Sequence, residues 1–104
     1  MFPHESLDSY KLAVIVARWT IATPWPTGLS DLKNQAQRAA SSVVLNIAEG
    51  YQRSGKARRN HYAIAHGSAA EVSAVLDIVD LPGRAEMKQY LDRIGAMLRR
   101  MRQH

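Results

Sequence analysis

The chain has 104 residues, 46% of them hydrophobic, a formal net charge of +5 at pH 7 and no cysteine. This length predicts a single domain over residues 1–104, and the missing cysteines exclude disulfide scaffolds and thiolate metal sites and fit a reducing cytoplasm. The first residues include acids and no apolar run, and the longest apolar run, at residues 12–17, is far shorter than the roughly 20 residues of a membrane span. We therefore expect a soluble cytoplasmic protein without a signal peptide.

The first predicted helix covers about residues 9–22 and is apolar on two sides. Positions 10, 14, 17 and 21 form one stripe, with the spacing of a helix face directed at a core. Leu12, Val16 and Trp19 form a second stripe. Because a small bundle covers only one side of a helix, we expect this second stripe to meet another subunit. Prolines within residues 24–28 end the helix.

Three further helices are predicted at about residues 31–52, 56–80 and 84–102, with a break at residues 81–83. Their apolar residues recur at spacings of three and four, and no segment alternates with period two. The last helix gives the clearest example, with Met87, Leu91, Ile94, Leu98 and Met101. Short connections favour antiparallel neighbours. The predicted fold is all-α: an antiparallel up-down-up-down four-helix bundle that is oligomeric.

Small residues dominate the expected contact between the second and third helices. Folding this hairpin at positions 54 to 55 brings together residues whose numbers sum to about 109. The expected opposite pairs are Arg38 with Glu71, Glu49 with Arg58 or Arg59, and Ser42 with Gly67. The first two would be ion pairs, and the pair of Arg38 with Glu71 would be partly buried. A close approach of the two backbones would offset the cost of about 1 kcal/mol for Gly67 inside a helix.

Asn46 and Glu49 lie one helical turn apart, as do Ser68 and Glu71. These polar residues could line a pocket for a ligand or metal near the turn. They could instead form a structural network that satisfies backbone groups and arginines, which is the interpretation we favour.

Nothing in the sequence indicates an enzyme. His61 and His66 are five residues apart, so they do not share a helix face as a pair of metal ligands would. The serines have no nearby base with an orienting group, and no phosphate-binding loop is present. No cofactor and no metal are expected.

The excess of positive charge lies in the second half of the chain. Residues 1–50 contain four Lys/Arg and four acids, whereas residues 51–104 contain ten Lys/Arg and five acids. Two clusters without acids carry this excess: Arg53, Lys56, Arg58 and Arg59, and then Arg93, Arg99, Arg100 and Arg102. Clustered cations are typical of surfaces that bind nucleic acid or another polyanion. Cations near the end of a helix also complement its dipole, which is the alternative explanation.

The central hairpin also resembles a known family. The matching residues are Leu32, Gln35, Arg38, Ala39, Ala40, Ser42, Asn46, Ile47, Ala48, Glu49, Gly50, Arg53, Ile64, Ala65, Gly67, Ser68 and Glu71. In these positions the chain resembles the bacterial four-helix bundle proteins first described from intervening sequences in large-subunit ribosomal RNA genes. It is also similar to the accessory variability proteins of diversity-generating retroelements. The resemblance implies a four-helix up-and-down subunit and a ring-shaped homopentamer; the chain departs from the family in its more basic turn at residues 55–59.

Two functions are compatible with this pattern. The first is a non-catalytic oligomer that binds RNA or DNA, or a nucleic-acid enzyme such as a reverse transcriptase, through its basic surface. Its contacts would be Arg53, Lys56, Arg58 and Arg59, with a second patch of Arg99, Arg100 and Arg102. Such contacts act on phosphates, so binding would be largely independent of sequence and sensitive to salt. The alternative is a structural or protein-interaction module whose basic residues only keep it soluble.

Overall fold

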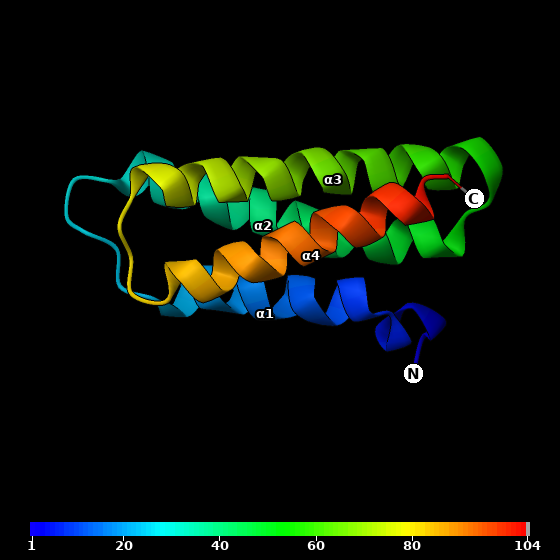
Figure 1. Cartoon of the computed structure of the whole chain (residues 1–104), viewed down its shortest axis with the longest axis horizontal. Coiled ribbons are helices and arrows are strands. Elements are labelled where there is room, and N and C mark those ends of the chain that lie inside the picture. The colour runs from blue at the N-terminus through cyan, green and yellow to red at the C-terminus, as the bar shows by residue number, and fades with distance from the viewer. Residues whose placement is uncertain (104) are drawn as a thin grey trace.

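The computed structural model describes residues 1–103, which form an all-α protein (Figure 1). A short 3-10 helix, η1 (Pro3–Ser6), precedes four α-helices: α1 (Asp8–Ala22), α2 (Ser30–Gln52), α3 (Gly55–Ile78) and α4 (Arg84–Met101). The number of helices is as predicted, and the bounds of each lie within two residues of those expected from the sequence. No helix of this part of the chain has both the length and the apolarity that crossing a bilayer requires.

The four helices form an elongated body of 43 × 24 × 19 Å. α1 packs against α2 and α4, and α3 packs against the same two helices; the contact between α2 and α3 is the most extensive. The connections at residues 23–29 and 79–83 lie at one end of the body. The α2–α3 turn and the C-terminal end of α4 lie at the other end (Figure 1), which brings together two segments far apart in the sequence.

The spacing of apolar residues in α4 shows why these helices bury the sides they do. Met87, Leu91, Ile94 and Leu98 recur every three or four residues, and each is at most 5% exposed. Residues at this spacing share one face of a helix, and burying each such side chain contributes roughly 1.5–3 kcal/mol. The predicted inner face of α4 is therefore confirmed.

The structure corrects the predicted role of the second stripe of α1, while Tyr10 and Ala17 of the first stripe are partly buried against the core. Leu12 and Val16, expected at a subunit interface, are buried in the core of this subunit, and Trp19 packs against that core. Ile21, from the stripe expected to face inward, is 65% exposed. Both stripes have helical spacing, so periodicity could not choose between them. Trp19 packs closely on the loop before α4, because its indole Nε1 would lie only 3.1 Å from a Cβ at Gly83, the left-handed residue there.

The close approach of α2 and α3 lies at Gly50, near the turn, rather than at Gly67 as predicted. A Cβ at Gly50 would lie 2.7 Å from Cε1 of Tyr62, whereas nothing lies within 4 Å of a Cβ at Gly67, which is exposed. The register of the two helices is close to the predicted one, because the hydroxyl of Ser68 donates a hydrogen bond to that of Ser42 at 2.9 Å. The cost of Gly67 in α3 is thus not offset by a contact within the subunit.

The predicted ion pair between Arg38 and Glu71 is wrong. Both side chains are exposed. The ion pairs among the described residues are those of Arg53 with Glu49, Arg84 with Asp80, and Lys88 with Asp77. The hairpin register alone predicted the pair, but both residues lie on outer faces of their helices, where water solvates them.

We accordingly expect Arg38 and Glu71 to be nearly independent. Exposed pairs that do meet are worth about 0.2–1 kcal/mol, so a double-mutant cycle of Arg38→Ala and Glu71→Ala should give a coupling of less than about 0.3 kcal/mol. Urea unfolding of the parent, both single variants and the double variant measures it. A coupling above about 1 kcal/mol would contradict the exposed positions of the two side chains.

Candidate nucleic-acid interface

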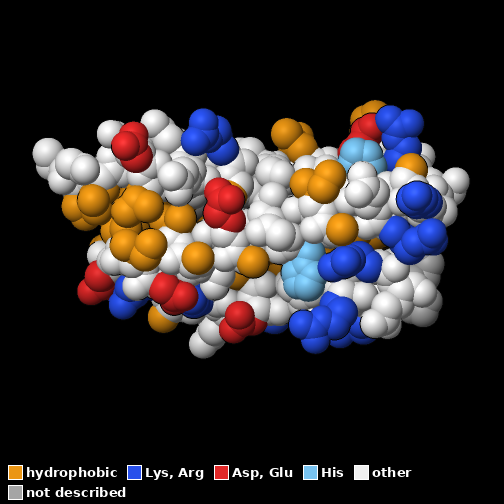
Figure 2. Space-filling model, turned by 90° about the horizontal axis from the view of Figure 1, so that it is seen from above, with side chains coloured by type: hydrophobic (Ala, Val, Ile, Leu, Met, Phe, Trp, Pro, Cys, Tyr) orange, Lys and Arg blue, Asp and Glu red, His pale blue; other side chains and the backbone are white. Residues whose placement is uncertain are grey.

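The predicted basic clusters lie at the same end of the bundle, except for Arg93, which lies halfway along α4. The turn cluster (Arg53, Lys56, Arg58 and Arg59) spans the end of α2 and the start of α3, and the C-terminal cluster (Arg99, Arg100 and Arg102) lies at the end of α4. Figure 2 shows Lys and Arg side chains gathered toward this end, while most acids and a broad apolar area on the same face lie toward the other. Folding therefore joins the two clusters in one basic end.

The side chain of Arg53 forms an ion pair within its own subunit. Its guanidinium donates to Oε1 of Glu49 one turn earlier in α2, with the Nε at 3.2 Å. This hydrogen bond, together with the positive charge of Arg53, holds the pKa of Glu49 below its usual value. Glu49 thus pairs within α2 and not with Arg58 or Arg59 across the hairpin, which corrects the sequence prediction.

Arg58 donates hydrogen bonds to backbone carbonyls at the C-terminal end of α2. Its Nε donates to the carbonyl of Gly50 at 3.2 Å, and its Nη2 donates to the carbonyl of Tyr51 at 2.9 Å. The guanidinium also lies over the Tyr51 ring, 5.4 Å from its centroid. The last carbonyls of a helix have no partner within the helix, so Arg58 caps α2 and fixes the turn.

Lys56 and Arg59 are the two members of the turn cluster that remain open to a ligand. Both are exposed, and neither forms an ion pair or side-chain hydrogen bond with another described residue. The first turn of α3 contains no acid, although the helix dipole favours acids and disfavours cations there. This arrangement suits an anion supplied from outside the chain.

The C-terminal cluster divides between two sides of α4. Arg100 lines a hollow of about 420 Å³ with Asp8 and Ser9 of α1. Arg99 and Arg102 lie on the side of α3, where they line a hollow of about 320 Å³ with Gln103. The three arginines therefore do not form a single patch.

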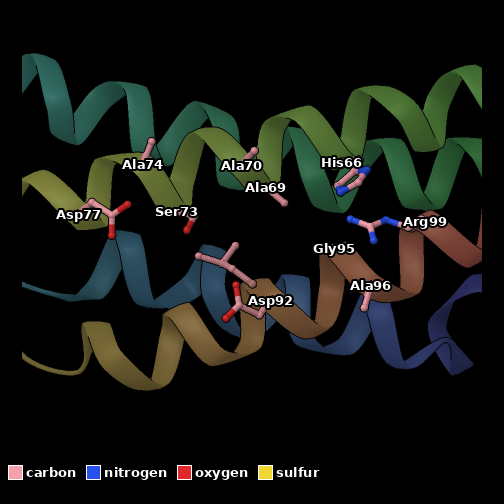
Figure 3. A pocket seen from close by; sticks show the side chains of 11 residues that line it. His66, Ala69, Ala70, Ser73, Ala74, Asp77, Asp92, Gly95, Ala96 and Arg99 are labelled. Atoms are coloured by element: carbon pink, nitrogen blue, oxygen red, sulfur yellow. The ribbon is translucent and has the colours of Figure 1, made fainter.

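His66 joins Arg99 and Arg102 on that side, a partner that the sequence did not reveal. The Nδ1 of His66 lies 3.1 Å from Nη1 of Arg102. Figure 3 shows the side chains of His66 and Arg99 reaching toward each other from α3 and α4 across one end of a groove of about 400 Å³. Partial burial, followed by the charges of Arg102 and then Arg99, lowers the pKa of His66 below its ordinary 6.5.

The remaining polar residues of the hairpin hold α2 and α3 together. The Nδ2 of Asn46 donates to the carbonyl of Ser42 at 2.9 Å, and its Oδ1 lies 2.9 Å from Nδ1 of His61 on α3. Ser42 also binds Ser68, so the chain of contacts crosses the seam twice. These contacts are those of a structural network, and they leave His61 and His66 bound to different partners.

A hollow of about 480 Å³ lies beside this network, between the N-terminal segment and α2. It is lined by Phe2, His4, Leu45, Asn46, Ala48, Glu49, Gln52 and His61. Its polar groups already bind other parts of the chain, such as Gln52 with His4 at 3.4 Å. Within residues 1–103, no three His, Asp or Glu side chains are grouped so as to hold a metal ion.

Comparison with known proteins agrees with the resemblance seen in the central hairpin. Searches of curated proteins and of solved structures found no match. The family model described as 23S rRNA-intervening sequence protein matches residues 5–100, which include all four helices except the last residue of α4. A match of this extent identifies the family, and this chain belongs to the 23S rRNA-intervening sequence protein family.

Proposed function

We propose that this protein is a non-catalytic, cytoplasmic oligomer of antiparallel up-down-up-down bundles that binds RNA or DNA, or an enzyme acting on them, through its basic end. The observation that carries this proposal is the meeting of two basic clusters, separate in the sequence, at one end of the bundle. Helix-end electrostatics account for cations in the last turn of α4, but not for the exposed Lys56 and Arg59 in the first turns of α3.

The open cations favour contacts with phosphates over contacts with bases. Lys56, Arg59, Arg99 and Arg102 are exposed, and one face of the Tyr51 ring at the end of α2 is covered by the guanidinium of Arg58. That face of the ring is not free to stack on a base. Binding would then depend on charge, be largely independent of sequence and weaken steeply with salt.

An exposed apolar surface on α1 and α2 supports the oligomer. Ile21 and Leu45 are 65% and 66% exposed, and they border a hollow of about 240 Å³ that is also lined by Val14, Ala17 and Val44. Apolar side chains grouped in this way are common at interfaces between subunits. Following the family resemblance, we propose a homopentamer. Repeating the basic end in each subunit would raise the avidity of individually weak contacts.

Removing the two open cations of the turn is expected to abolish most of the binding. Fluorescence anisotropy with labelled RNA and double-stranded DNA at about 50 mM salt should show binding by the parent and at least about tenfold weaker binding by a variant with Lys56→Gln and Arg59→Gln. Binding by the parent should also fall steeply at about 200 mM salt. Arg58 is left in place because it caps α2.

The matched control removes the same charge from the N-terminal half of α2, away from the α2–α3 turn. A variant with Lys33→Gln and Arg38→Gln should bind as the parent does, because neither residue belongs to the basic end. Equal losses in both variants would mean that net charge, and not this surface, governs binding.

The alternative is a structural or protein-interaction module that does not bind nucleic acid. The exposed apolar surface around Ile21 and Leu45 favours it, since that surface needs only another protein chain. A parent protein that assembles normally but binds neither RNA nor DNA at about 50 mM salt would establish this alternative.

A further inference from the structure

The groove between α3 and α4 places a neutral imidazole against two arginines. A guanidinium has only hydrogen-bond donors, so its contact with Nδ1 of His66 at 3.1 Å requires that nitrogen to accept. His66 is therefore neutral in this arrangement, with its proton on Nε2. The ring lies beside Gly95 of α4, where a Cβ would be 3.6 Å from Nε2 of His66, an ordinary contact distance.

The charged groups around His66 are all positive. Arg102 and Arg99 of α4 lower its pKa, and no acidic group, which would raise it, is among the causes of the shift. The α3 residues nearest to it in the groove, Ala69 and Ala70, carry no charge. Figure 3 shows the acids of the groove, Asp77 and Asp92, away from the end occupied by His66 and Arg99. Asp77 is moreover paired with Lys88.

Protonation of His66 would remove the acceptor that Arg102 uses. Two donors would then face each other beside Arg99, with no acceptor between them. An anion seated among the three groups would accept hydrogen bonds from both arginines and from the protonated imidazole. A phosphate group suits such a position, because its oxygens accept several hydrogen bonds at once and arginine can bind it through two.

We propose that His66, Arg99 and Arg102 form a binding site for a phosphate group, and that His66 takes up a proton when the phosphate binds. This site adds a specific contact to the proposed function. It rests on that function only in the source of the phosphate, which would be a nucleic-acid backbone. The same chemistry would also bind free inorganic phosphate. His66 and Arg99 line the groove of about 400 Å³, and Arg99 and Arg102 line the hollow of about 320 Å³, so Arg99 joins the two.

The proton fixes the direction of the pH dependence. Without an anion, the pKa of His66 lies below the 6.5 of an unperturbed histidine. The unfolded chain then binds more protons just below that pH, so the stability contributed by His66 is complete above about pH 6.5 and declines as the pH falls. A bound anion favours the protonated ring, so anion affinity should rise over the same fall in pH. A pKa raised by about one unit corresponds to about tenfold tighter binding by the protonated form.

The test is an NMR titration of the His66 ring, identified by the loss of its signal in the His66→Gln variant. It is made in chloride, in sulfate and in inorganic phosphate at equal ionic strength; sulfate keeps its charge across the range. The pKa of His66 should rise by at least about half a unit in sulfate and phosphate relative to chloride. The ring signals of His4, which stacks on Phe2 outside the proposed site, serve as an internal reference for general effects of the salts.

A second arm uses a labelled RNA oligonucleotide and identifies the source of the phosphate. The parent should bind it several-fold more tightly below about pH 6.5 than above it, and His66→Gln should remove this dependence while keeping a neutral acceptor for Arg102. His4→Gln serves as the control and should keep the dependence. Arg102→Gln should lower sulfate and RNA affinity at every pH.

The outcomes separate this inference from the proposed function. No change in the pKa of His66 with sulfate or phosphate overturns the site, even if RNA binds elsewhere on the basic end. RNA binding that His66→Gln leaves equally dependent on pH overturns it as well. A raised pKa without any RNA binding supports a site for free phosphate and contradicts the nucleic-acid function instead.

Discussion

Replacing Gly50 with alanine is expected to destabilise the subunit by about 1–3 kcal/mol, although alanine is ordinarily the better helix former. The added methyl group would lie 2.7 and 2.9 Å from Cε1 and Cδ1 of Tyr62 and 3.0 Å from Cβ of His61. The Tyr62 ring is 3% exposed, so it cannot swing aside without disturbing the core. Urea unfolding followed by circular dichroism measures the change.

Gly67 provides the matched control, because it is a second glycine within the same helical hairpin. No atom lies within 4 Å of a Cβ at this position. Gly67→Ala should therefore stabilise the protein by up to about 1 kcal/mol, through helix propensity alone. Changes of the same sign at the two glycines would contradict the close contact of α2 with Tyr62.

Introducing two acids into the exposed apolar surface is expected to dissociate the oligomer. Ile21→Glu combined with Leu45→Glu would place charges where the proposed interface excludes water, and burying an unpaired charge costs several kcal/mol per site. Light scattering should then give the mass of a single chain, 11.6 kDa, in place of a multiple of it. The helical signal should persist, because both side chains are largely exposed in the subunit.

Ile78→Glu tests whether any new surface charge has this effect. Ile78 is as exposed as the other two residues, at 68%, but it lies at the end of α3, away from the hollow between α1 and α2. This variant should assemble as the parent does. If light scattering gives the mass of one chain for the parent protein, the proposed oligomer is contradicted.

The helices could be predicted because their signals are local. Spacings of three and four, prolines and the break at residues 81–83 define each element without reference to the others. The orientation of α1 is a property of the packed bundle. Its stripes at Leu12 and at Val14 are similarly apolar, and only packing against the other helices distinguishes them.

The basic clusters could also be predicted, but the partner of each side chain could not. Arginine side chains are long, so Arg58 reaches back to two carbonyls of α2 while the adjacent Arg59 remains open. Pairing residues across the hairpin by their numbers alone does not distinguish Arg58 from Arg59. A signal for His66 did exist: folding the chain at position 82 places residues near 98 opposite it, close to Arg99.

The concentration of cations at one end gives each subunit an electric dipole along its 43 Å axis. In a ring whose subunits all point the same way, these dipoles add, and the two rims differ in charge. A long polyanion would then follow the cationic rim alone, and titration would saturate at one strand per ring. The opposite rim, with its acids and apolar side chains, would remain free to receive a protein at the same time.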